Sequence, residues 1–244
     1  MANPIMKIEE RQAEREATIN ADEIMTVNGA LQVTGFMGLL LVMAAFFVWS
    51  KFSAGHTDFG MMLTSIGGIV GFISALVIAF GRITALVPVY AISEGLLLGG
   101  LSAIFENSYP GIVAQATAGT FAALFSMLLL YRAGIIRCTD KFRSVIFIST
   151  ASVAVIYIVD FIGRLFGYAV PIIHTATNAG IGFSLIVIAI AALNLIIDFD
   201  FIEQGAQRMY PKKYEWYGAF GLMVTLVWLY VEILNLLAKI NSRD

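Results

Sequence analysis

The chain has 244 residues, of which 59% are hydrophobic and 13% are charged. Ordinary soluble domains contain roughly 45–50% apolar and about 25% charged residues, so this composition excludes a soluble domain and predicts an integral membrane protein in a lipid bilayer. The formal net charge of −2 argues against a nucleic-acid partner, which would favour a basic face.

Residues 1–26 are predicted to form a polar tail in which acidic side chains alternate with a few basic ones. An early apolar run is absent from this stretch, so we expect no cleavable signal peptide, and the first membrane span must direct targeting. The domain organisation expected is therefore a polar tail over 1–26 and a membrane domain over 27–244.

Seven apolar segments follow the tail, each close to the roughly 20 residues that a helix needs to cross the hydrocarbon core. They must be helices, because a backbone in lipid has to satisfy its own hydrogen bonds and these segments lack the alternation of barrel strands. The fold class predicted is an all-α membrane protein with seven transmembrane helices. The predicted spans are 29–50, 60–81, 86–105, 111–132, 143–166, 178–200 and 215–240.

The short loops orient the predicted bundle. Most Lys and Arg residues outside the spans lie in the tail and in the second, fourth and sixth loops. Cytoplasmic loops carry the excess of Lys and Arg, which predicts a cytoplasmic N-terminus. Seven spans then place the C-terminus on the far side, where Lys239 and Arg243 fit the rule less well. A last helix that inserts only partly is the alternative.

Small residues are spaced for close helix packing in two of the spans. Gly67, Gly68 and Gly71 lie in the second span, and Gly95 and Gly99 lie in the third. Small residues four apart let helices approach closely. We interpret these glycines as contacts within one copy of the chain rather than as a dimer interface.

Charged residues in the second, third and fifth spans have different interpretations. Asp160 and Arg164 are four apart, so they share a helix face and are expected to form a structural pair near a helix end. Glu94 lies about eight residues inside its span, where a functional or bundle-organising role competes with plain packing. Arg82 closes the second span and either reaches the headgroups or turns inward as the counter-ion of a buried acid.

The sixth span ends in three carboxylates. Asp198 and Asp200 are two residues apart, a turn of about 200° on a helix, so only one can point toward the bundle axis. Asn194 and Asp198 are four apart, and we interpret them as the inward face. Asp200 and Glu203 are interpreted as an interfacial pair at a solvated helix end.

Glu232 lies deep in the seventh span and has no basic residue within one helical turn. Its nearest polar neighbour on the helix is Asn235. An isolated carboxyl at this depth must be protonated, hydrated or paired with a group from another helix. Glu94, Asn194 and Asn235 are the further polar candidates to line a pore.

Other chemistries find little support in the sequence. The two histidines fall in different loops, and neither an HExxH zinc motif nor a phosphate-binding glycine loop is present. We therefore expect no enzyme and no cofactor.

Two segments in particular suggest a family. Tyr90–Gly99 in the third span and Leu229–Leu236 in the seventh, together with seven spans and the acidic end of the sixth, resemble the Bax inhibitor-1 family in its bacterial branch. The resemblance covers about residues 29–240. It implies six helices around a central seventh, a bacterial inner-membrane location, and a pH-sensitive calcium leak.

The resemblance also implies the gating residues. In the family, one acid from the sixth helix and one from the seventh share a proton and latch the pore; Asp198 and Glu232 match them, with Asp200 as the alternative to Asp198. An arginine of the second helix is a third partner, and Arg82 matches it. Departures are the glutamate at 232, where aspartate is usual, and a longer last loop.

The hypothesis is therefore a calcium leak controlled by protons. Two carboxylates at close range in a low-dielectric site cannot both ionise, so a shared proton would hold the two helices together. Once ionised, Asp198 and Glu232 would offer the oxygen ligands that calcium prefers, as a transient site. The alternatives are a membrane protein that regulates other membrane proteins without transport of its own, and a proton-coupled transporter, for which no inverted repeat is visible.

Overall fold

The computed structural model describes residues 23–81 and 83–243, and the fold is all-α. Within these two ranges, seven helices are long and apolar enough to cross a membrane, which confirms the predicted spans. They begin and end within a few residues of the predicted limits, except that the sixth is longer at its C-terminal end. The long helices are α2 (Val27–Ser53), α3 (Thr57–Gly81), α4 (Val87–Ser108), α5 (Ile112–Arg132), α6 (Asp140–Leu165), α8 (Asn178–Gln207) and α9 (Lys213–Asn241), and the short ones are η2 (Thr84–Leu86) and α7 (Pro171–His174).

Threonine side chains set where three of the long helices begin. Thr26, Thr139 and Thr177 precede α2, α6 and α8, and each hydroxyl accepts a hydrogen bond from the backbone N–H three residues later. A side-chain oxygen at this position satisfies one of the N–H groups that a helix start leaves without a partner. These caps explain why α2 and α6 begin two or three residues before their purely apolar runs.

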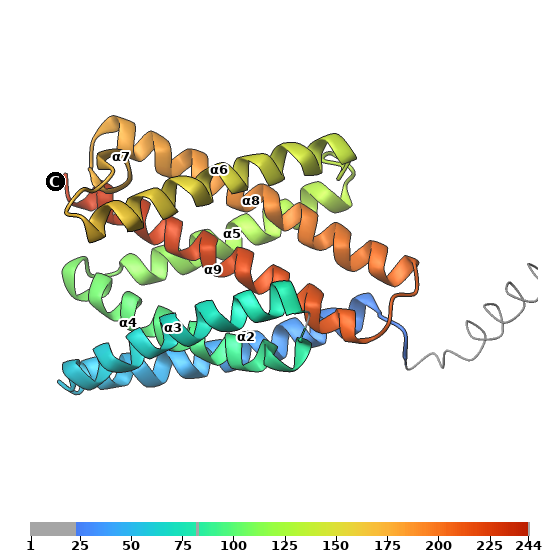
Figure 1. The fold of residues 1–244 in the computed structure, drawn as a ribbon, viewed down its shortest axis with the longest axis horizontal. Helices are drawn as coiled ribbons and strands as arrows, with labels where there is room; N and C mark the ends of the chain where they lie inside the picture. Colours follow the sequence, from blue (N-terminus) through green and yellow to red (C-terminus); the bar gives the residue numbers. More distant parts are fainter. Residues whose placement is uncertain (1–22, 82, 244) are drawn as a thin grey trace, which may run out of the picture.

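The long helices lie roughly antiparallel along one bundle axis (Figure 1). α4 packs against both α2 and α3, α8 packs against α9, and α9 also contacts α2, α4 and α5. The arrangement of six helices around a central seventh stays a prediction. The end of α9 lies at the opposite end of the bundle from the start of α2, as expected for seven crossings (Figure 1).

Glycines bring α4 close to α2 and α3, as the sequence predicts. A Cβ atom on Gly95 would lie 2.7 Å from the side chain of Ala44 in α2, and one on Gly67 would lie 2.6 Å from the carbonyl oxygen of Ser93. Both distances are too short for real carbon atoms, so only glycine permits this approach. The predicted contacts within one copy of the chain are confirmed.

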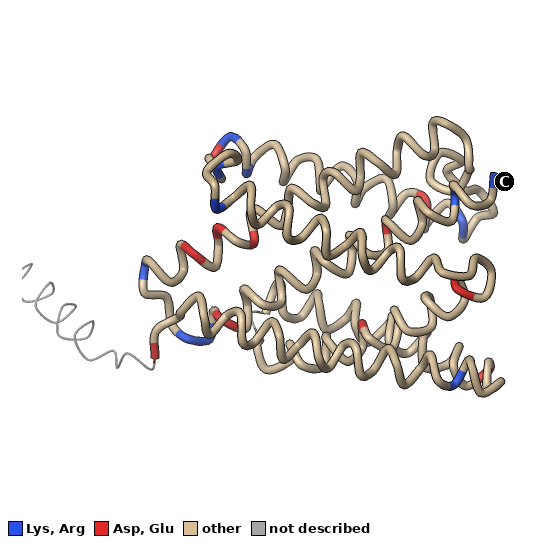
Figure 2. The backbone as a smooth tube through the Cα atoms, turned by 180° about the vertical axis from the view of Figure 1, so that it is seen from behind, with Lys and Arg blue, Asp and Glu red and all other residues tan. Residues whose placement is uncertain are grey.

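Large apolar side chains cover much of the outer surface of the bundle. The charged positions lie mainly toward its two ends (Figure 2). Phe80 of α3 and Phe147 of α6 are among many large apolar side chains that point outward, with exposed fractions of 86% and 73%. Contiguous apolar surface of this extent requires an apolar solvent. The chain is therefore a multi-pass integral membrane protein in a lipid bilayer.

The predicted polar tail falls partly outside the described residues, which begin at Glu23. The backbone of Met25 donates to the carbonyl of Tyr210 at 2.7 Å, and the Thr26 N–H donates to Glu215 Oε1 at 2.9 Å. The segment 23–26 is thus attached to the connection between α8 and α9. The boundary at residue 26 and the cytoplasmic side of the tail stay predictions.

Candidate functional site: the acids of α8 and α9

Asp198 of α8 points at α9. Its Oδ2 accepts a hydrogen bond from Thr225 Oγ1 at 2.6 Å. Gly221, one turn earlier on α9, leaves room for this carboxyl, since a Cβ there would lie 3.2 Å from Asp198 Oδ1. Asp198 therefore faces the neighbouring helix of the bundle, whereas its assignment as the inward, gating acid stays a prediction.

Asp200 points the other way, toward α5 and α6. It forms an ion pair with Arg143 at the start of α6, and it accepts hydrogen bonds from Gln204 Nε2 at 2.8 Å and Tyr131 OH at 3.3 Å. Only 7% of Asp200 is exposed. The interpretation of Asp200 as part of a solvated helix end is wrong, because α5 and α6 cover this side of α8.

Glu203 shares the Asp200 side of α8, as the helical phase predicts. Its Oε2 accepts a hydrogen bond from Tyr131 OH at 2.6 Å, but the side chain is exposed. Cys138, in the loop before α6, contacts the arginine that pairs with Asp200: its Sγ accepts a hydrogen bond from Arg143 Nε at 3.2 Å. Burial raises the pKa of the Cys138 thiol, and the Arg143 guanidinium partly offsets that rise. We call Tyr131, Arg143, Asp200, Glu203 and Gln204 the Asp200 cluster.

Glu232 of α9 is buried and takes its partners from α6 and from its own helix. Its Oε1 accepts hydrogen bonds from Tyr157 OH at 2.5 Å and from Trp228 Nε1 at 3.2 Å. Of the alternatives for an isolated carboxyl, the structure therefore provides a partner from another helix. Neither partner carries a charge, which distinguishes Glu232 from Asp200.

Asp198 and Glu232 do not meet in this conformation, which corrects the predicted proton-sharing pair. Asp198 lies level with Thr225, and Glu232 follows Thr225 by seven residues, about 10 Å along the helix axis. Each carboxyl has its own hydroxyl donor, from Thr225 and Tyr157 respectively. Sequence position alone could not set this axial offset, because it depends on how α8 and α9 pack.

Asn194 does not share the direction of Asp198. Its Nδ2 donates to Thr150 Oγ1 of α6 at 2.9 Å and to the carbonyl of Ile190 at 2.8 Å. The predicted inward face of α8 therefore contains Asp198 without Asn194. A role for Asn194 in lining a pore stays a prediction.

One face of α9 presents the residues that contact or include the two carboxyls. Gly221, Thr225, Leu229 and Glu232 follow one another at intervals of three or four residues, and we call them the α9 stripe. Leu229 lies between the levels of Asp198 and Glu232, is fully buried, and belongs to one apolar cluster with Ala191 and Leu195 of α8. An apolar seal thus separates the two carboxyls along α9.

A cavity of about 770 Å³ adjoins Glu232, on the side of the seal toward the C-terminus, and several polar side chains line it. We call it the Glu232 cavity. Tyr157 and Trp228 line it beside the carboxyl, and Asn235 and Lys239 line it further along α9. Asn235 therefore lines a cavity, and its predicted role in lining a pore stays a prediction.

Asp160 and Arg164 form the predicted pair, and the pair lines the Glu232 cavity. Asp160 Oδ2 lies 3.1 Å from Arg164 Nε and 2.8 Å from His174 Nε2, and Oδ1 accepts the Val170 N–H at 2.8 Å. These contacts attach the connection containing α7 to α6. The sequence indicated the Asp160–Arg164 pair by its spacing but not His174, which lies fourteen residues away from Asp160.

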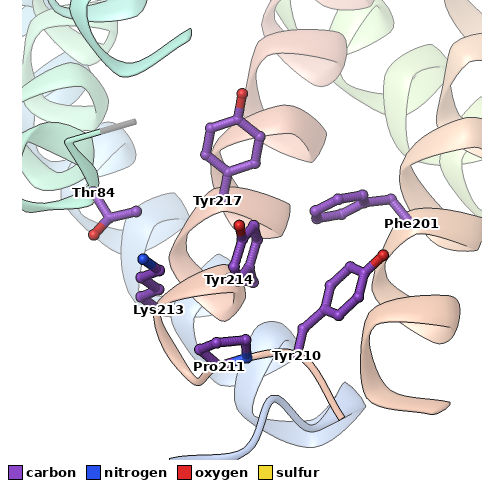
Figure 3. A pocket seen from close by; sticks show the side chains of 7 residues that line it. All are labelled: Thr84, Phe201, Tyr210, Pro211, Lys213, Tyr214 and Tyr217. Carbon is purple, nitrogen blue, oxygen red and sulfur yellow. The ribbon is translucent and has the colours of Figure 1, made fainter. Parts of the chain in front are cut away.

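A second cavity, of about 440 Å³, lies at the other end of α8 and α9. Figure 3 shows the rings of Phe201, Tyr210, Tyr214 and Tyr217 around it. Phe201 follows Asp198 by three residues, so this tyrosine cavity begins about one turn from the carboxyl. A cavity therefore lies near each end of the α8–α9 contact.

Two further predicted site residues are Glu94, a candidate to line a pore, and Arg82, the candidate partner of a gating acid. Glu94 is 9% exposed, and a Cβ on Gly71 of α3 would lie 3.0 Å from its Oε1. Arg82 lies outside the described residues, so its predicted partnership with an acid stays a prediction. Within residues 23–81 and 83–243, no group of three or more His, Cys, Asp or Glu side chains is arranged to hold a metal ion.

Comparison with known proteins identifies a matching family. Residues 3–242 match the family model described as Bax inhibitor 1 like, which is nearly the whole chain. No curated protein sequence matches the chain. The match includes all seven long helices and both carboxyls of the α8–α9 contact.

Proposed function

The chain belongs to the Bax inhibitor 1 like family, and from this premise we propose that it is a pH-sensitive calcium leak channel in a closed conformation. The family consists of membrane proteins that are not generally enzymes. The proposed location is a bacterial inner membrane, with the N-terminus in the cytoplasm.

One observation carries the proposal. Asp198 of α8 lies level with Thr225 of α9, Glu232 lies about two turns further along α9, and the buried Leu229 lies between these two levels. Each carboxyl is bonded to neutral donors, from Thr225 in one case and from Tyr157 and Trp228 in the other. Acids at membrane depth are costly, so they are typical of ion pathways and proton sites. Leu229 between them accounts for closure, since an apolar constriction excludes ions and water.

Protons would control this seal through the two carboxyls separately. A protonated carboxyl is compatible with an apolar neighbourhood, whereas a buried ionised one is strongly unfavourable unless water or a counter-ion reaches it. Loss of the protons at higher pH would therefore favour hydration of the α8–α9 contact and opening past Leu229. The carboxylates would then attract calcium, which prefers oxygen ligands, and repel anions.

Calcium flux into liposomes that contain only the purified protein tests the proposal. We expect flux to rise with pH in the unaltered chain. Glu232→Gln and Asp198→Asn keep an oxygen for the hydroxyl donors but cannot ionise, so each should hold flux near its acid-pH level. Asp58→Asn is the matched control, because Asp58 is an exposed acid in the first turn of α3; it should keep the normal profile.

The outcomes separate this function from its alternative. A normal pH profile in both Glu232→Gln and Asp198→Asn would remove these carboxyls from the gate. No calcium flux at any pH in the unaltered chain would contradict the leak and favour a protein that regulates other membrane proteins.

A further inference from the structure

Lys239 is a buried cation of α9 that the proposed gate does not use. It follows Glu232 by seven residues, so it lies on the same face of the helix, about 10 Å further along the axis. A lysine this close to a helix end would ordinarily extend to the headgroups. Here only 9% of Lys239 is exposed, and the side chain lines the Glu232 cavity.

The Lys239 ammonium is held by neutral oxygens of α8. Nζ donates to Ser184 Oγ at 2.7 Å and to the Gly180 carbonyl at 3.2 Å. Among the residues that the structure describes, no carboxylate lies within 4 Å of this nitrogen. Hydroxyl and carbonyl oxygens are also ligands of metal cations, so the ammonium occupies a position suited to a cation.

The remaining charged groups of the cavity come from α6 and α7. Asp160 is paired with Arg164 and also contacts His174. On the α9 wall, the described residues leave two ionisable groups, Glu232 and Lys239, that are hydrogen-bonded only to neutral groups. A cation bound in this cavity beside Glu232 would therefore lie near a fixed ammonium.

We propose that Lys239 is a tethered cation that weakens divalent-ion binding in the Glu232 cavity and thereby limits calcium flux. The inference rests on the proposed function for its effect on flux, but the binding effect is independent of transport. The ligand in question is a bare metal cation. The weakening of its binding by Lys239 should increase with the charge of that ion.

Coulomb's law sets the expected size. A unit charge about 10 Å from the ion, at an effective dielectric constant of about 50 for a partly hydrated cavity, weakens binding of a divalent ion about tenfold. The logarithm of the change is proportional to ion charge, so a trivalent ion should show about a thirtyfold change. A purely structural effect of Lys239 would have no reason to follow this proportion.

The test uses Trp228 as a reporter, because its indole donates to the Glu232 carboxyl. Trp49→Phe and Trp216→Phe leave Trp228 as the single tryptophan, and Ca²⁺ and La³⁺ are titrated against its fluorescence in the purified full chain. Lys239→Gln removes the charge and keeps a donor for Ser184, Lys239→Met is the second neutral variant, and Lys239→Arg keeps the charge. Lys51→Met, at a lysine near the end of α2, is the control for surface charge.

We expect the midpoints of Lys239→Gln and Lys239→Met to fall about tenfold for Ca²⁺ and further for La³⁺, with Lys239→Arg and Lys51→Met unchanged. Calcium flux in liposomes should rise in the same two neutral variants. Unchanged midpoints, equal shifts for both ions, or a lower melting temperature without tighter binding would each overturn the inference. Tighter binding without any flux in the unaltered chain would support the inference and contradict the leak.

Discussion

The two aspartates of α8 are two residues apart, yet their surroundings differ in kind. Asp200 is paired with the Arg143 guanidinium and bonded to Gln204 and Tyr131. Among the described residues, Asp198 is hydrogen-bonded to the Thr225 hydroxyl alone, opposite a glycine. A guanidinium stabilises an ionised acid permanently, whereas a hydroxyl serves both protonation states. The comparison teaches that Asp200 holds helices together through a charge pair, whereas Asp198 has the neutral surroundings expected of the acid that we propose responds to protons.

Glu232 resembles Asp198 in that its hydrogen-bond donors are neutral. Its donors are a phenol and an indole, from Tyr157 and Trp228, and both are neutral. Among the described residues, these two acids of the α8–α9 contact have no hydrogen-bonded basic partner, whereas the Asp200 cluster contains a charge pair. Substitutions in the Asp200 cluster should accordingly affect mainly the free energy of unfolding, and substitutions at the α8–α9 contact mainly the pH profile of calcium flux.

The largest effect on stability is expected from Asp200→Ala. The change leaves Arg143 without its buried carboxylate and removes an acceptor for Gln204 and Tyr131, which should lower the free energy of unfolding by about 2–3 kcal/mol. The measurement is the denaturant dependence of helical circular dichroism in detergent. Asp200→Asn is the matched control, since it keeps an acceptor oxygen and should cost about half as much.

The same variants test the functional side of the comparison. Asp200→Asn should keep the pH profile of calcium flux, in contrast to Asp198→Asn. Loss of the profile in Asp200→Asn alone would reverse the assignment and make Asp200 the gating acid.

An intermediate effect is expected from Thr225→Val, which replaces a hydroxyl by a methyl group of similar shape. The Asp198 carboxyl loses its donor, so we expect a loss of about 1 kcal/mol in unfolding free energy and a higher calcium leak at acidic pH. Thr225→Ser, which keeps the hydroxyl, should behave as the unaltered chain does. An acid-pH leak as low as in the unaltered chain would show that the Thr225–Asp198 hydrogen bond does not contribute to closure.

The smallest effect is expected from Glu203→Gln. Glu203 belongs to the Asp200 cluster but is exposed, and Tyr131 can donate equally to an amide oxygen. Unfolding free energy should change by no more than about 0.5 kcal/mol, and the flux profile should stay the same. A change as large as that of Asp200→Asn would mean that exposure does not separate the two acids.

Much of the fold could be predicted from hydropathy and helical geometry. The length of the apolar runs predicts seven spans, because the thickness of the hydrocarbon core sets the length of a helix that crosses it. The 3.6-residue period separates Asp198 from Asp200 and places Asp160 beside Arg164. Glycines at spacings of four predict the close approach of α4 to its neighbours.

The candidate site could be predicted only in part. Arg143, Tyr157 and Lys239 were not recognised as partners, because each contacts a residue more than fifty positions away. Their only sequence signal was a polar group within or beside a span. The predicted contact between Asp198 and Glu232 was wrong for a related reason: it required the axial offset of two helices, which no local pattern encodes.

The sequence by itself determined the membrane as solvent, the number of spans, and the divergence of Asp198 and Asp200 on α8, because these depend on composition and on distances along one helix. Only the tertiary structure decided which acid has a charged partner and where Leu229 and Lys239 lie relative to Glu232. The physical reason is that hydrogen bonds and ion pairs act over a few ångströms between helices, and packing alone brings those atoms together.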